Sequence, residues 1–235
     1  MRTMKSHLPS GAKMLAAGVG ATLGVYGAIA AIAWYRYGRV APADEPDRDT
    51  LLDRFVPVYD VVERHHIRVA APPAVTLIAA REQDLFRLPL VHAIFKTREL
   101  ILRATPDQQP QPRGLFAATQ AMGWGVLAEI PGREVVVGAV TKPWEANVTF
   151  QALPPDEFAA FSQPGYVKIV WTLRADPLGD TSSMFRTETR AVATDRRARA
   201  RFRRYWAFVS PGIGLIRRLS LGPLKRDAER RARAA

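Results

Sequence analysis

The chain has 235 residues, 48% of them hydrophobic and 24% charged, as expected for a globular protein with one substantial core. It contains no cysteine, which excludes disulfides, thiolate catalysis and Cys-ligated zinc. The net charge of +12 is concentrated at the two ends: residues 1–40 carry +5 and residues 195–235 carry +10, whereas residues 41–194 carry −3. Basic ends on a mildly acidic body favour contact with an anionic membrane surface over contact with nucleic acid.

A long apolar segment follows a basic tail at residues 1–13. Residues 14–35 carry no charge, and at 1.5 Å per residue they are long enough to cross a hydrocarbon core of about 30 Å. Trp34 and Tyr35 lie at its end and Arg36 follows, a pattern typical of a membrane interface. We therefore predict one transmembrane helix over residues 14–35.

The same segment contains a pair of glycines that could mediate helix–helix contact. Gly20 and Gly24 form a GxxxG pair, a spacing that allows close helix–helix approach, so a homodimer through this pair is a further expectation.

A cleaved signal peptide is the alternative to an anchor, because small residues stand at cleavage spacing near the end of the segment. Basic residues nearly balance on its two sides, which leaves the side of the membrane open. The Ala- and Arg-rich composition suggests a bacterial protein, so we expect a single-pass protein of the bacterial cell membrane.

A Pro- and acid-rich linker at residues 36–53 separates this segment from the body of the chain. The body is predicted to contain one strand, two short helices, a run of strands and one long helix. In chain order these are strand 56–69, helices at about 72–80 and 84–95, strands 124–130, 134–140, 147–153, 166–174 and 181–192, and a helix that runs to the C-terminus. Strands that follow one another without helices predict an antiparallel meander.

The C-terminal helix is the only large amphipathic element that can cover the apolar face of such a sheet. Thr194 or Asp195 can cap its first turn. Its apolar residues recur at a helical period and arginines fill the rest of its surface; the apolar stripe comprises Ala198, Phe202, Tyr205, Trp206 and Val209. Pro211 lacks an N–H group, so the helix must kink or break there.

Four segments of the body are distinctive in sequence: GREVVVGAVTKPW (132–144), FSQPGYVKIVW (161–171), TETR (187–190) and FRRYWAFVSPGIGLIRR (202–218). With the order of elements, they resemble the helix-grip fold of the START / Bet v 1-like (SRPBCC) superfamily over residues 54–230, which leaves a basic tail at 231–235. The resemblance implies an α+β fold in which a curved antiparallel sheet wraps around the long C-terminal helix. It also implies a cavity between them that often holds an apolar ligand. Members include lipid carriers, polyketide cyclases and hydroxylase subunits, and no catalytic residue can be transferred, because the segments are similar to a bacterial group of unassigned function.

Two polar groups on the strands could carry chemistry. Glu63 and His65 share one face of strand 56–69 and could act as an acid–base pair, although a hydrogen-bonded polar pair near the sheet edge is the simpler interpretation. Arg186, Glu188 and Arg190 alternate on one face of the last strand. They are most simply an ion-pair ladder, with Glu134 as a further partner of the arginines, and alternatively a head-group site inside a cavity.

The aromatic side chains Trp124, Trp171, Phe202 and Trp206 could line an apolar cavity or fill it. No common hydrolase, kinase, zinc-protease or dinucleotide motif occurs, and we expect no metal and no cofactor. The leading hypothesis is a membrane-anchored, non-enzymatic protein that holds or shuttles an apolar, lipid- or isoprenoid-like molecule. Its expected partners are membrane lipid and an apolar small molecule, and not nucleic acid. The alternatives are a cyclase-type enzyme that uses Glu63, His65 or Glu188, and a membrane scaffold with a filled core.

Overall fold

The computed structural model describes residues 10–40, 43–45, 47–85, 91–93, 96–97, 100, 103 and 112–234. The elements are α1 Ser10–Arg36, α2 Thr50–Asp53, β1 Val61–Val69, α3 Pro73–Glu82, α5 Leu115–Ala121, β2 Gly125–Ile130, β3 Glu134–Thr141, β4 Phe150–Gln151, α6 Pro155–Ala160, β5 Val167–Pro177, β6 Ser183–Ala193 and α7 Arg196–Ala234. Most of the basic tail at 1–13 and most of the helix expected at 84–95 lie outside the described residues.

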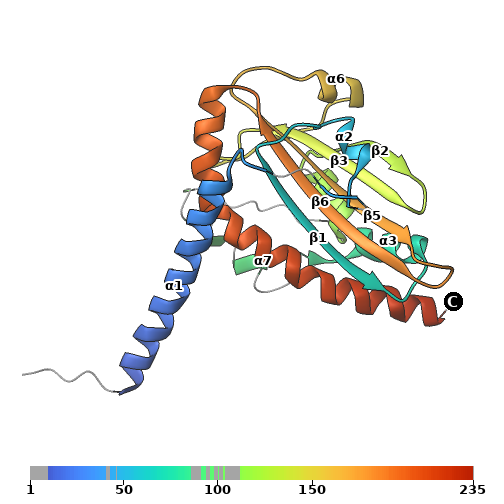
Figure 1. The fold of residues 1–235 in the computed structure, drawn as a ribbon, viewed down its shortest axis with the longest axis horizontal. Helices are drawn as coiled ribbons and strands as arrows, with labels where there is room; N and C mark the ends of the chain where they lie inside the picture. The colour runs from blue at the N-terminus through green and yellow to red at the C-terminus, as the bar shows by residue number, and fades with distance from the viewer. Residues whose placement is uncertain are drawn as a thin grey trace, which may run out of the picture.

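The strands form one curved antiparallel sheet in the order β1-β6-β5-β3-β2, with β4 paired to β3 (Figure 1). The predicted meander is therefore confirmed, and the chain has an α+β fold with a long C-terminal helix. Local predictions differ from the structure at four places. The strand expected over 147–153 is only Phe150–Gln151, and the short helices α2, α5 and α6 are not among the predicted elements.

The sheet has two covered faces. On β5, Trp171 and Leu173 point to the face that packs against α3 and α7, which we call the inner face. Val170, next to Trp171, points to the opposite or outer face and packs with Leu52 and Phe158. Part of the segment expected as a linker thus belongs to the outer layer, since Leu52 in α2 is fully buried.

Helix α7 crosses the inner face as one helix of 39 residues that continues through Pro211 and Pro223. Figure 1 shows its ribbon changing direction in the first half, as the predicted kink requires. The side chain of Asp195 accepts hydrogen bonds from the backbone N–H groups of Arg197 (2.6 Å) and Ala198 (3.0 Å), which confirms the predicted cap. The predicted aromatic stripe also points inward, because Phe202 and Trp206 are buried against the sheet.

Helix α1 packs the end of its length against the start of α7 and otherwise projects from the body (Figure 1). Arg203 of α7 donates to the carbonyl oxygen of Trp34 at 2.9 Å, and the rings of Tyr26 and Phe208 meet edge to face at 6.3 Å between centroids. Among the described residues, no helix is both long and apolar enough to cross a bilayer. The transmembrane helix over 14–35 stays a prediction, and so does a homodimer through Gly20 and Gly24.

Candidate functional site

The interface between α7 and the inner face is apolar at both ends and polar in the middle. At one end Phe202 and Trp206 pack with side chains of β1, β5 and β6. At the other end Leu224 and Ala228 pack with side chains of α3 and of four strands, Val69, Val135, Trp171 and Phe185 among them. No residue of α7 strictly between Ser210 and Ser220 is buried, although Ile213 packs, half-buried, against the first cluster. We call this middle part of the interface between α7 and the sheet the polar gap.

Arg217 is the central side chain of the polar gap. Its guanidinium donates hydrogen bonds to the hydroxyl oxygens of Thr187 (3.0 Å) and Thr189 (2.8 Å) on β6, and it lies 5.7 Å from the ring centroid of Trp171. No carboxylate oxygen of a described residue lies within 4.0 Å of it. Burial lowers the pKa of Arg217 to about 10, although the charge of Glu63 opposes the shift. The gap therefore contains a cation whose hydrogen-bond partners are neutral.

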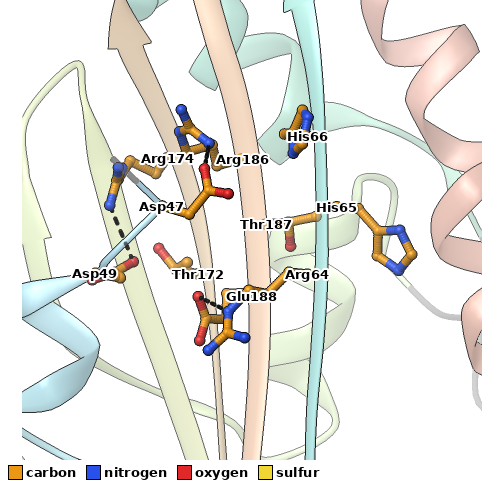
Figure 2. Close-up of a pocket in the computed structure, with 10 residues that line it drawn as sticks. All are labelled: Asp47, Asp49, Arg64, His65, His66, Thr172, Arg174, Arg186, Thr187 and Glu188. Carbon is orange, nitrogen blue, oxygen red and sulfur yellow. Dashed lines mark hydrogen bonds and ion pairs between the residues drawn. The ribbon is translucent and has the colours of Figure 1, made fainter. Parts of the chain in front are cut away.

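Glu63 and His65 face the same gap from β1. The register places them beside Thr189 and Thr187, and 3.4 Å separates Nε2 of His65 from Oε2 of Glu63. Nε2 of His65 is buried and has no hydrogen-bond partner among the described residues. Figure 2 shows His65 directed away from the charged residues on the other side of the sheet. The two side chains predicted to form a pair are therefore in contact, at the site where Arg217 lies.

The second predicted group lies on the outer face and forms the ladder. Arg190 donates to Glu188 (2.7 Å) and to Asp53 (2.6 Å), and Arg64 on β1 approaches Glu188 to 3.1 Å. Arg186 pairs with Asp176 (3.1 Å) and with Asp47. Some partners thus come from the segment around α2 rather than from neighbouring strands.

One prediction about this group is wrong. Glu134 does not pair with Arg186 or Arg190, because the register places it opposite Arg174, and it accepts a hydrogen bond from Thr172 at 3.2 Å. The side chains of Glu188 and its pairing partner Arg64 lie on the outer face. The sheet therefore separates Glu188 from Glu63 and His65, the other two residues named for a cyclase-type enzyme.

The outer face also contains a small polar pocket (Figure 2). The space open to the centre of a water molecule is about 20 Å³, which is enough for about one water. The residues around it are Asp47, Asp49, Arg64, His65, His66, Thr172, Arg174, Arg186, Thr187 and Glu188. A space of this size and polarity does not suit an apolar ligand, and the ion pairs around it already satisfy its charges.

Glu134 is the most strongly perturbed acid of the outer face. It is almost fully buried, and this burial, followed by the charge of Asp49 and a hydrogen bond with it, raises the pKa of Glu134 to about 8. Arg174 and Thr172 oppose the shift. Glu134 therefore holds its proton to a higher pH than an exposed glutamate does.

The predicted aromatic residues belong mainly to the two apolar clusters. Phe202 and Trp206 form the first cluster, and Trp171 belongs to the second with Trp124 packed at its edge. The rings of Trp124 and Trp171 lie 6.4 Å apart in an edge-to-face arrangement. Most of these rings fill the interface, and Trp171 is the one that also borders the polar gap.

Sequence reasoning missed Arg217, although the sequence carries a signal for it. With 3.6 residues per turn, Arg217 falls in the centre of the stripe that runs from Phe202 and Trp206 to Leu224 and Ala228. A charged side chain at the centre of an otherwise inward-facing stripe indicates a binding site or a buried ion pair. No group of three or more metal-ligating side chains occurs in the described part of the chain.

Comparisons with known proteins leave the family open. No family model matches the chain, and no curated protein matches it. Among solved structures, it is similar to CV1439 from Chromobacterium violaceum, with 14% identity and a TM-score of 0.34 over 72% of this chain and 96% of the other.

Two other solved structures show the same level of similarity. The hypothetical protein jhp0584 from Helicobacter pylori has 8% identity and a TM-score of 0.38 over 80% and 99% of the two chains. The Zhui aromatase/cyclase from Streptomyces sp. R1128 has 13% identity and a TM-score of 0.26 over 74% and 96%. Similarities this low carry no argument about function, so the function has to be inferred from the geometry of the chain itself.

Proposed function

We propose that the protein is a membrane-associated carrier that holds a largely apolar molecule, of lipid or isoprenoid type, between α7 and the inner face of the sheet. The polar gap between the two apolar clusters carries this proposal. A helix that only stabilised the sheet would bury apolar side chains along its whole length. Here apolar walls flank a short stretch that presents hydrogen-bonding groups, which is the composition of a site for a small amphiphile.

Open space beside Gly214 supports the same site. Gly214 lies on the edge of the inward stripe of α7, and a Cβ atom built there meets nothing within 4 Å among the described atoms. A well-packed helix–sheet interface would place a neighbour at this distance. The gap can therefore accept atoms of a ligand without displacing the sheet.

Exposed apolar surface on α1 supports an association with a bilayer. Val25, Ile32 and Tyr35 are 61%, 52% and 67% exposed, and Phe208 of α7 adds to this surface where the two helices meet. Arg36 and Arg39 follow the exposed stretch. Large apolar side chains beside basic ones suit the surface or the interior of an anionic membrane. We include the transmembrane span over 14–35 and a location in the bacterial cell membrane in this proposal.

A blocked gap tests the carrier function. Gly214→Phe would place a ring in the open space, whereas Gly222→Phe is the matched control, because its Cβ points toward the flexible end of Arg226. The full chain is purified from membranes, and its bound molecules are identified by native mass spectrometry and solvent extraction. We expect a lipid-like molecule on the wild type and on Gly222→Phe and none on Gly214→Phe. A wild type that carries no such molecule and takes up none from vesicles would contradict the proposal and favour a scaffold with a filled core.

The contact between Glu63 and His65 favours one second candidate, an enzyme that uses this pair for proton transfer on the bound molecule. Nε2 of His65 has no hydrogen-bond partner among the described residues and lies 3.4 Å from Oε2 of Glu63, the arrangement that a proton transfer between the two side chains needs. Under this alternative, the molecule extracted from His65→Gln differs in structure from the one extracted from the wild type. The carrier proposal expects the same molecule on both.

A further inference from the structure

We propose that Arg217 binds the anionic head group, a carboxylate or a phosphate, of the amphiphile that occupies the polar gap. This inference rests on the proposed carrier function and narrows the class of ligand. It assigns a role to a side chain that has no partner of opposite charge within ion-pair distance among the described residues.

The hydrogen bonds of Arg217 leave part of its guanidinium unused. A guanidinium carries five N–H donors, and the bonds to Thr187 and Thr189 use one from each terminal nitrogen. Both acceptors are neutral hydroxyls, so they orient the group without neutralising it. A cation at a helix–sheet interface is unfavourable unless it is paired, because it has lost much of its hydration. An anion that enters the gap would supply the missing charge and accept the remaining N–H groups in a bidentate arrangement.

The charged and titratable groups around Arg217 leave room for such an anion. Of the described residues on the inner face, Glu63 is the acid whose charge reaches Arg217, and it is already in contact with His65. The nitrogen of His65 that meets Glu63 is Nε2, which is buried. Gln83, the residue after α3, donates to the carbonyl oxygen of Ser220 at 2.7 Å and brings no charge to the gap. The gap therefore offers one cation to a ligand, and the acid that faces it lies against His65.

The position of Arg217 also fits a molecule with a head and a tail. It lies between Trp206 on one side and Leu224 on the other, each part of an apolar cluster. A head group on Arg217 would place the tail along one of these clusters or toward the open space at Gly214. The arrangement selects an anionic amphiphile over a neutral one of the same length.

Binding of three matched probes tests the inference. The probes are a fluorescent long-chain fatty acid, the alkyl phosphate with the same chain and the corresponding alcohol, each titrated into the full chain in neutral-lipid nanodiscs. The variants are Arg217→Met, Arg217→Lys and Arg218→Met; the last is the matched control, because Arg218 is the next residue on the same helix and turns away from the gap. A charge-assisted hydrogen bond favours the anion by about ten- to a hundredfold in Kd.

We expect the wild type and Arg218→Met to bind at least one of the two anions about ten- to a hundredfold more tightly than the alcohol. Arg217→Met should lose this preference and still bind the alcohol, and Arg217→Lys should keep part of it. A preference for the acid over the phosphate, or the reverse, identifies the head group. If the wild type binds all three probes equally, or if Arg217→Met retains the preference, the head-group site is wrong and the carrier proposal stands. If the wild type binds none of the probes, both proposals fail.

Discussion

Each face of the sheet contains an arginine that is largely removed from solvent, Arg190 fully and Arg217 in part, and the two are satisfied differently. On the outer face, Arg190 meets two carboxylates at 2.6 and 2.7 Å and also donates to the carbonyl oxygen of Val56. On the inner face, Arg217 meets two threonine hydroxyls. A charge with a full set of partners holds a structure together, whereas a charge without a counter-ion destabilises it unless a ligand is present. This difference separates a structural network from a candidate binding site.

The outer network has an evident structural task. Its arginines hold the segment around α2 against the sheet: Arg174 donates to the carbonyl oxygen of Arg48 at 3.1 Å, and Arg190 reaches Asp53. Behind these contacts, Leu52 and Phe55 pack on apolar residues of the outer face. The ion pairs therefore close the outer core by fixing a segment that joins α1 to β1.

The largest effect is expected where the outer network is broken. Arg190→Met would leave Glu188, which is buried, with Arg64 as its remaining partner among the described residues. Breaking a buried pair from one side typically costs about 3–5 kcal/mol of unfolding free energy. Urea denaturation followed by circular dichroism measures the loss. Arg48→Met is the control, because Arg48 is exposed and its pair with Asp53 should contribute about 0–1 kcal/mol. Equal stability of the two variants would show that the network is not structural.

The second effect concerns Glu134 and the dependence of stability on pH. The folded protein raises the pKa of Glu134 from 4.5 to about 8, so between these values the native state binds a proton that the unfolded state has released. Stability from this group is therefore fully present below about pH 4.5 and is lost as the pH rises through about 8. A pKa difference of one corresponds to about 1.4 kcal/mol, so a rise of this kind contributes on the order of a few kcal/mol, shared between Glu134 and Asp49.

Glu134→Gln keeps the shape of the side chain and removes the titration. The free energy of unfolding of this variant should therefore not decrease in the way that the wild type's does between about pH 5 and pH 8. Urea denaturation at the two pH values gives the slope. Glu129→Gln, on the neighbouring strand β2, is the control: its side chain is 36% exposed and pairs with Arg81, and the variant should retain the wild-type slope. A wild-type slope in Glu134→Gln would mean that another group holds the proton.

The third prediction concerns the inner face, where a substitution is expected to raise the free energy of unfolding or leave it unchanged, not lower it. If Arg217 serves a ligand, its replacement by Met should leave the ligand-free protein as stable as the wild type or more stable by about 1 kcal/mol, because a desolvated charge is exchanged for an apolar side chain. Arg218→Met should change stability by less than about 0.5 kcal/mol. Urea denaturation of delipidated protein decides the outcome. A loss of more than about 2 kcal/mol in Arg217→Met would assign Arg217 to the fold and remove the argument for a head-group site.

Much of the fold could be predicted because it depends on local patterns. Alternation along the strands predicted the antiparallel run, and the spacing of Phe202 and Trp206 predicted which side of α7 is buried. The strand expected over 147–153 shrank to two residues, because pairing with β3 extends only to Val140 and Thr141. Such limits depend on contacts between distant segments, which no local pattern contains.

The site was harder to predict because a strand pattern gives two sets of residues without saying which set faces the helix. The alternation of Arg186, Glu188 and Arg190 identified one face correctly, but only the packing of α2 shows that this is the outer face. Arg217 was missed because the surrounding run of arginines suggested a solvent-exposed surface. Its position on the apolar stripe was the better guide.

The smallest effect concerns Glu63, the acid whose charge reaches Arg217. Its carboxylate competes with an anionic ligand for the guanidinium and repels the ligand, and because its side chain is partly exposed the repulsion is screened. Glu63→Gln should therefore bind the fluorescent fatty acid about two- to fivefold more tightly than the wild type, while its affinity for the alcohol stays the same. A weaker affinity for the acid in Glu63→Gln would mean that Glu63 positions Arg217 or His65 for the ligand, and the inner face would then hold a preorganised polar network like that of the outer face.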